Sequence, residues 1–157
     1  MSKKSLIIVA HPDDETLWAG GTILSRPEWE WSVISLTRAK DKDRSIRFYK
    51  ALKYYDAFGS MANIDDSPEQ KKISSKFMKK KIMDLISGER SYDLIITHGP
   101  KGEYTRHRRH EEVSSSASDL WLKGEIESKK LILFAYEDGS GKYLPRAEKK
   151  AHCEFRI

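Results

Sequence analysis

Short apolar segments that alternate with stretches of helical periodicity predict an α/β protein. We expect a Rossmann-like three-layer fold, in which helices flank a mostly parallel sheet on both faces. The first apolar segment, residues 6–10, is rich in β-branched side chains, which is typical of a strand buried on both faces. Further strands are predicted at residues 31–37, 92–97 and 131–136.

Helices are expected after each of the first three strands. Residues 16–24 predict a helix that Gly20 and Gly21 weaken, and a later helix is expected to end at a glycine cap, Gly59. Residues 60–69 are predicted to form a loop, and residues 73–86 a helix. The apolar stripes of the three later helices comprise Phe48, Ala51, Leu52 and Tyr55; Ile73, Phe77, Met78, Ile82, Leu85 and Ile86; and Val113, Ala117, Leu120 and Trp121.

Composition limits the class of protein. The 157 residues, 38% hydrophobic and 34% charged, predict one domain that spans residues 1–157. The single cysteine, Cys153, excludes an internal disulfide and favours a reducing compartment, so we expect a cytoplasmic location. No apolar run approaches the roughly 20 residues of a membrane span. The net charge of +5 fits an anionic ligand, but the chain has no interleaved basic and aromatic motif, so no nucleic-acid partner is expected.

Acidic residues and a histidine follow the first predicted strand directly. The sequence His11-Pro12-Asp13-Asp14-Glu15 ends the apolar run, because proline cannot donate to a sheet ladder. Carboxylates also favour the first turn of a helix. One imidazole and two carboxylates are thus expected at the carboxyl end of a central strand, where open α/β sheets bind ligands.

A second group of histidines follows the strand at residues 92–97. His107 and His110 are three residues apart in a basic loop. Because parallel strands end at the same edge of a sheet, this loop should meet the first motif over one cleft. His11, Asp14 and His110 would then offer two imidazole nitrogens and one carboxylate, a set that zinc uses in catalytic sites.

These two motifs resemble those of the LmbE-like, or PIG-L, family of zinc-dependent sugar N-deacetylases. The match rests on His-Pro-Asp-Asp-Glu with the later residues 19–22, and on residues 97–104 followed by His-x-x-His. The resemblance implies Zn²⁺, with another divalent transition metal as an alternative, at His11, Asp14 and His110. Asp13 would act as the base, and His107 would stabilise the oxyanion.

The chain departs from the family pattern at several positions. Arg108 and Arg109 stand where Pro-Asp is usual, and we expect both to make the mouth of the site more cationic. Arg44 matches a substrate-binding arginine, but Arg47 replaces the glutamate that usually follows. Tyr104 is a candidate for lining the substrate pocket.

Four further residues have weaker roles. His98 is expected to orient its loop without binding the metal, and Glu15 to steady the helix start. Core packing is the favoured role of Trp18. His152, with Cys153, does not make a convincing second metal site.

The predicted function is removal of an N-acetyl group from an amino sugar or its conjugate, a small substrate that can be neutral or anionic. Two alternatives stay open: an amidase that cleaves a different small amide at the same zinc site, and a catalytically silent sugar- or nucleotide-binding domain. The residues predict neither the aglycone nor the oligomeric state.

Overall fold

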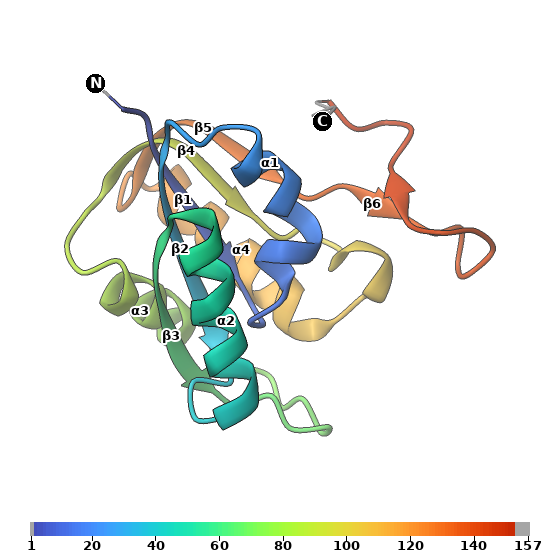
Figure 1. Cartoon of the computed structure of the whole chain (residues 1–157). Helices are drawn as coiled ribbons and strands as arrows, with labels where there is room; N and C mark the ends of the chain where they lie inside the picture. Colours follow the sequence, from blue (N-terminus) through green and yellow to red (C-terminus); the bar gives the residue numbers. More distant parts are fainter. Residues whose placement is uncertain (1, 153–157) are drawn as a thin grey trace.

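The computed structural model describes residues 2–152, so Cys153 and the end of the basic tail lie outside the described residues. Five parallel strands form one sheet in the order β3-β2-β1-β4-β5 (Figure 1). Their bounds are β1 Lys4–Val9, β2 Glu30–Thr37, β3 Phe58–Ile64, β4 Ser91–Thr97 and β5 Glu127–Leu133. The predicted α/β class with a parallel sheet is confirmed.

Helices cover both faces of the sheet. The π-helical turn η1 (Glu15–Ala19), α1 (Gly20–Leu24) and α2 (Lys42–Tyr55) pack on one face, and α3 (Ser75–Leu85) and α4 (Arg108–Leu122) on the other. Alternate residues of β1 separate the two cores, since Leu6 and Ile8 belong to the α3–α4 side and Ile7 and Val9 to the α1–α2 side. This arrangement gives the three layers that the sequence predicted. Among the described helices, none is long and apolar enough to cross a membrane.

The strand β3 corrects the sequence analysis, which placed a helix cap and a loop there. The helix α2 ends earlier, where Asp56 adopts a left-handed conformation with φ 53°. Gly59 lies within β3 instead, and a Cβ at this position would meet Leu52 and come within 2.5 Å of the Val33 carbonyl oxygen. The glycine is therefore needed for close packing of an edge strand. Most of β3 is only partly buried, which hid its strand character.

The last strand is also displaced from its predicted position. Residues 131–136 were expected to be extended, but β5 is already paired with β4 at Glu127 and ends at Leu133. Its first half contains Ser128, Lys129 and Lys130, polar residues that an edge strand tolerates and that concealed its start. The short strands β6 (Tyr136–Glu137) and β7 (Arg146–Ala147) then pair antiparallel in the C-terminal segment.

The strand order places a ligand-binding position between β1 and β4. From β1 the chain proceeds outward through β2 and β3, and it then returns to the other side of β1 to form β4 and β5. Ligands of such sheets bind beyond the carboxyl ends of the strands where the order reverses. His11 and His98 follow β1 and β4 closely, so both lie at this point.

Candidate metal and catalytic site

The turn after β1 is held by its own acidic residue. Asp14 Oδ2 accepts the backbone N–H of His11 at 2.8 Å, and the N–H groups of Asp13 and Asp14 point back to the His11 carbonyl oxygen. From the neighbouring strand, the Thr37 hydroxyl donates to the Ala10 carbonyl at 2.8 Å. The side chains of His11 and Asp14 are thereby fixed at the carboxyl end of the sheet.

Three donor atoms from distant parts of the chain converge there. His11 Nδ1 lies 3.1 Å from His110 Nε2 and 3.2 Å from Asp14 Oδ2, and His110 Nε2 lies 3.5 Å from Asp14 Oδ2. A tetrahedral zinc site with bonds of about 2.0–2.2 Å has ligand atoms about 3.3–3.6 Å apart. The triangle of His11, Asp14 and His110 therefore has the dimensions of one face of such a site.

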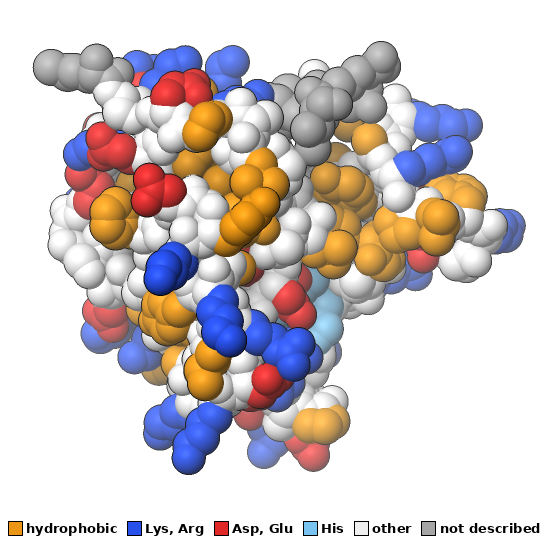
Figure 2. Space-filling view, in the orientation of Figure 1, with side chains coloured by type: hydrophobic (Ala, Val, Ile, Leu, Met, Phe, Trp, Pro, Cys, Tyr) orange, Lys and Arg blue, Asp and Glu red, His pale blue; other side chains and the backbone are white. Residues whose placement is uncertain are grey.

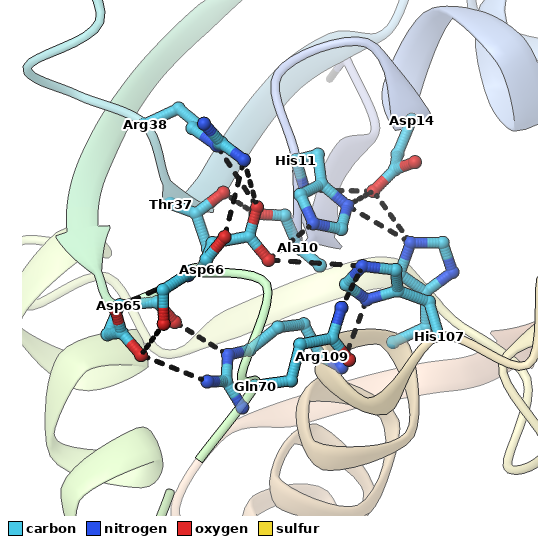
Figure 3. A network of polar contacts seen from close by, with 12 residues as sticks. Ala10, His11, Asp14, Thr37, Arg38, Asp65, Asp66, Gln70, His107 and Arg109 are labelled. Atoms are coloured by element: carbon cyan, nitrogen blue, oxygen red, sulfur yellow. Dashed lines mark hydrogen bonds and ion pairs between the residues drawn. The ribbon is translucent and has the colours of Figure 1, made fainter. Parts of the chain in front are cut away.

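Carboxylates behind the two imidazoles orient their lone pairs toward this triangle. Glu103 Oε2 lies 2.7 Å from His110 Nδ1. Asp66 Oδ1 lies 3.2 Å from His11 Nε2 (Figure 3). A proton on each of these outer nitrogens leaves His11 Nδ1 and His110 Nε2 unprotonated and facing the Asp14 carboxylate. Two lone pairs and a negative charge at this separation call for a cation, so the donor set fits a metal ion.

The contacts between the carboxylates and the imidazoles also shift the pKa values of Asp14 and His11. Burial raises the pKa of Asp14, but the hydrogen bond with His11 and the neighbouring imidazoles of His98 and His110 outweigh burial and hold it well below its usual range. Burial lowers the pKa of His11, and the carboxylates of Asp14 and Asp66 reverse this and raise it overall. The site thus keeps its carboxylates ionised and attracts positive charge.

The buried side chains of His98 and Glu103 contact each other and the residues of the triangle. His98 Nε2 accepts the Ala10 N–H at 2.9 Å, so the ring proton is on Nδ1, which faces Glu103 Oε2 at 3.2 Å. Glu103 Oε1 accepts the Gly99 N–H. Burial raises the pKa of Glu103, yet the hydrogen bonds from His110 and His98 lower it to about 2. The backbone contact occupies the lone pair of His98, which removes it as a donor to metal.

His107 lies beside the triangle, at the start of α4. Its Nδ1 accepts the Arg109 N–H at 3.3 Å and caps the helix, so the ring proton belongs on Nε2. That nitrogen lies 2.6 Å from Gln70 Nε2, and because two N–H donors cannot face each other, the amide oxygen of Gln70 belongs at this position as the acceptor of the His107 proton. Burial and the neighbouring imidazoles of His11 and His110 lower the pKa of His107 to about 4. His107 is thus a neutral imidazole with an N–H that it can donate.

In the described part of the chain, two overlapping groups place three potential metal donors within 4.8 Å of one another: His11, His107 and His110; and Asp14, His98 and His110. The hydrogen bonds of His98 and His107 engage the lone pair of each ring. We therefore take His11, Asp14 and His110 as the best candidate ligands.

Asp13 is exposed, unlike this buried set. Its side chain is 63% exposed, and its Oδ2 lies 3.4 Å from Arg44 Nη1. Asp13 lines a cleft of about 570 Å³. The other residues that line it are Pro12, Glu15, Thr16, Leu17, Asp43, Arg44, Arg47, Phe48 and Ala51. Arg47 pairs with Asp43 on the surface of α2. A carboxylate in solvent contact, one residue from a candidate ligand, is suited to exchange protons.

Glu15 also lines this cleft, but its carboxyl group is buried. Burial raises the pKa of Glu15 to about 7, and the charges of Asp14 and Asp13 add to that rise against a hydrogen bond from Thr16. Its Oε2 has no hydrogen-bond partner among the described residues. Glu15 begins η1, in keeping with the expected place at the start of a helix.

Tyr104 lies on the other side of the site, toward the C-terminal segment. Its ring meets that of Trp18 edge-on at 5.3 Å, and Trp18 is buried against Phe134 and Tyr136 as well. Tyr104 lines a cleft of about 450 Å³ next to Glu103. Figure 2 shows a histidine side chain in a recess, with charged side chains toward α2 and hydrophobic ones toward the C-terminal segment.

A family model described as PIG-L, GlcNAc-PI de-N-acetylase, matches residues 6–121. This range includes both histidine motifs and most of the chain. The chain belongs to the PIG-L family.

Similar proteins agree with this fold. The PIG-L chain is 25% identical to an uncharacterised protein of Acanthamoeba polyphaga mimivirus, over 94% of this chain and 68% of that protein. Dbv21, the deacetylase of an antimicrobial pseudoaglycone, matches with a TM-score of 0.64 and 14% identity, over 94% of this chain and 69% of its own. GalB, the 4-carboxy-2-hydroxymuconate hydratase of Pseudomonas putida, matches with a TM-score of 0.57 and 17% identity, over 86% and 65%. These two structures show the fold alone, and this chain spans about two thirds of each.

One expectation about this PIG-L chain is wrong. Arg109 was expected to make the mouth of the site cationic, but its side chain is fully buried. Its guanidinium bonds to the carbonyl oxygens of Asp65 and Lys71 and to Glu112. Arg108 is exposed and donates to the Gln70 carbonyl. The positive charge of Arg109 is therefore buried and paired with Glu112, and it does not reach the mouth of the site.

Sequence reasoning missed Asp66, which was assigned to a loop. Its side chain is 6% exposed, and Arg38 Nη2 donates to Oδ2 at 2.7 Å while Oδ1 faces His11. The available signal was its position: Asp65 and Asp66 follow the end of β3 as Asp13 and Asp14 follow β1. Once β3 was overlooked, that parallel could not be seen.

Proposed function

We propose that this protein is a zinc-dependent N-deacetylase that hydrolyses the acetamide of an amino sugar or its conjugate, of the N-acetylglucosamine type. The observation that carries the proposal is the triangle of His11 Nδ1, Asp14 Oδ2 and His110 Nε2, whose edges of 3.1–3.5 Å suit zinc. The family description, a de-N-acetylase, supports the reaction class. Because GalB has a similar fold and is a hydratase, the fold by itself does not determine the reaction.

Zinc at this set would supply a Lewis acid that polarises the amide carbonyl and lowers the pKa of a water molecule to about 7. Asp13 is the proposed base, because its carboxylate is exposed in the cleft and lies one residue from the candidate ligand Asp14. Asp13 takes the proton of the attacking water on a carboxylate oxygen. It then returns that proton to the amine nitrogen as the amide C–N bond breaks.

His107 is the proposed oxyanion donor. Its low pKa keeps the ring neutral, and its Nδ1 is engaged by the Arg109 N–H, so the Nε2 proton is the one available. That proton is donated to the carbonyl oxygen as negative charge develops. Arg44, beside Asp13, and Tyr104, beside Glu103, are the proposed substrate contacts on either side of the site.

The proposed substrate is small, and the arginines of the cleft suit an anionic group on it. The cleft at Asp13 is lined by Arg44 and Arg47, and the chain carries a net charge of +5. Guanidinium groups bind phosphate and carboxylate well because their paired N–H groups match two oxygens. A phosphorylated or nucleotide-linked amino sugar therefore belongs beside the free sugar in the assay panel.

The experiment is a measurement of metal content together with acetate release from neutral and anionic N-acetylated amino sugars. About one zinc per chain, acetate release, loss of activity on chelation and its return with zinc are the expected results. Metal without acetate release from any sugar would favour the amidase alternative, to be followed with other small amides. Failure to retain zinc after repletion would refute the ligand set and leave the silent binding domain as the better hypothesis.

A further inference from the structure

The buried side chain of Arg109 has a role that neither the metal triangle nor the proposed base requires. Its Nε donates to the Asp65 carbonyl oxygen at 2.7 Å, its Nη2 to the Lys71 carbonyl oxygen at 2.8 Å, and its Nη1 to Glu112 Oε2 at 2.6 Å. The planar guanidinium therefore joins Glu112 of its own helix to two acceptors that lie 44 and 38 residues away along the chain. These two acceptors are backbone groups of one segment.

That segment, residues 65–73, connects β3 to α3 and contains no helix or strand. The first turns of α4 hold it at further points. Glu112 Oε1 accepts the Ile73 N–H at 3.0 Å, and Arg108 Nη1 donates to the Gln70 carbonyl oxygen at 2.8 Å. Arg109 is the only one of these α4 side chains that is fully buried and bonds to two carbonyl groups of the segment. We call residues 65–73 the clamped segment.

The clamped segment delivers two side chains to the histidines (Figure 3). Asp66 Oδ1 lies 3.2 Å from His11 Nε2, and the amide of Gln70 lies 2.6 Å from His107 Nε2. Asp66 directly follows Asp65, and Gln70 directly precedes Lys71, so each lies next to a residue whose carbonyl Arg109 holds. The segment also forms a wall of a polar cleft of about 570 Å³ that His107 lines.

We propose that Arg109 is a positioning residue that acts through the clamped segment, holding Asp66 against His11 and Gln70 against His107. The inference rests on the proposed function, in which His11 is a metal ligand and His107 is the oxyanion donor. It also explains how the site can be ordered with arginine where the family pattern has aspartate. The orienting carboxylate of this chain comes from another segment, and Arg109 fixes that segment.

The contacts at position 109 require the shape of an arginine side chain. Its N–H groups diverge in one plane and can bind two carbonyls and a carboxylate at once, whereas a lysine ammonium offers three donors at a single point. A lysine at position 109 would keep the charge and the partner Glu112, but it could not hold Asp65 and Lys71 together. Arg109→Lys should therefore fold and still release the segment.

The test compares Arg109→Lys and Arg109→Met with a control, Lys79→Met, which removes an ion pair between α3 and Asp119 of α4 away from the site. Zinc affinity is measured by competition with a chromophoric chelator, and hydrogen exchange is measured by mass spectrometry on the metal-free proteins. We expect both Arg109 variants to weaken zinc binding about 10–100-fold, as changes behind a ligand do, and to accelerate exchange in residues 65–73. The control should change neither.

A double variant tests the route of the effect. If Arg109 acts through Asp66, Asp66→Asn combined with Arg109→Lys should bind zinc no more weakly than the weaker single variant. Additive losses would overturn the proposed route, and wild-type zinc affinity with unchanged exchange in Arg109→Lys would overturn the clamp itself. A wild-type chain that binds no zinc would refute the proposed function instead, while the exchange measurement would still decide whether Arg109 holds the segment.

Discussion

Replacing Asp13 by asparagine should abolish turnover while leaving the metal in place. The exchange removes one negative charge and a proton acceptor from an exposed side chain, without changing its size. Its neighbour Asp14 provides the contrast, since Asp14 Oδ2 lies 2.8 Å from the His11 backbone nitrogen and 3.2 Å from His11 Nδ1. Asp14→Asn should therefore lose metal, although the two substitutions are adjacent and chemically identical.

The expected size of the Asp13→Asn effect follows from its environment. Loss of a general acid–base group costs about 10²–10⁴ in rate, which corresponds to about 2.7–5.4 kcal/mol of transition-state stabilisation. Its ion pair with Arg44 joins side chains that are 63% and 43% exposed, so the free energy of unfolding should change by less than about 1 kcal/mol. Loss of activity can therefore be separated from loss of the fold.

The assay measures kcat for acetate release, zinc per chain and the denaturant midpoint of unfolding for the wild type and both variants. Asp13→Asn should retain zinc and the wild-type midpoint with kcat lowered at least 100-fold. Retained activity would refute the base assignment. Loss of zinc from Asp13→Asn would show that Asp13 is a ligand, and the role of Asp14 would then have to be reconsidered.

Three further outcomes are expected. Glu103→Gln should weaken zinc binding about 10–100-fold, because the carboxylate that orients His110 is lost; chelator competition measures this, and unchanged affinity would contradict it. Arg44→Met should raise KM for an anionic N-acetylated sugar more than for a neutral one, and equal changes in steady-state assays would argue against a substrate contact. Gly59→Ala should lower the free energy of unfolding by about 1–3 kcal/mol, because the new methyl group meets Val33 and Leu52. A denaturant titration tests this, and an unchanged midpoint would show that the strand adjusts.

The central strands were predictable and the edge strands were not. Burial on both faces gave β1 a continuous apolar sequence, and β2 and β4 also carry buried runs that the sequence analysis located. The edge strand β3 begins with Phe58, which is 76% exposed, and β5 begins with polar residues. Edge strands have weaker hydrophobic patterns because one side of the strand has no neighbour and their faces are less covered.

The same difference applies to the site. His11, Asp14 and His110 stand in compact motifs, so the sequence nominated them, and the structure brings their donor atoms together. Asp66 reaches the site only through β3, which was missed. Arg109 looked like a surface cation because a charged residue in a basic loop is usually solvated. Its burial is favourable because the Glu112 carboxylate and two carbonyl groups of another segment accept its N–H groups.

The sequence separation of 99 positions from His11 to His110 has a consequence for folding. In the unfolded chain these two side chains can meet only by closing a long loop, which is entropically costly. A metal ion that needs both ligands therefore binds the native state and hardly binds the unfolded chain. Mass action then converts affinity into stability, by about 2.7 kcal/mol when the free ion is at 100 times its dissociation constant. A thermal-melting scan across divalent metals should therefore rank the ions by affinity before any substrate is known, with the largest rise in Tm identifying the preferred one.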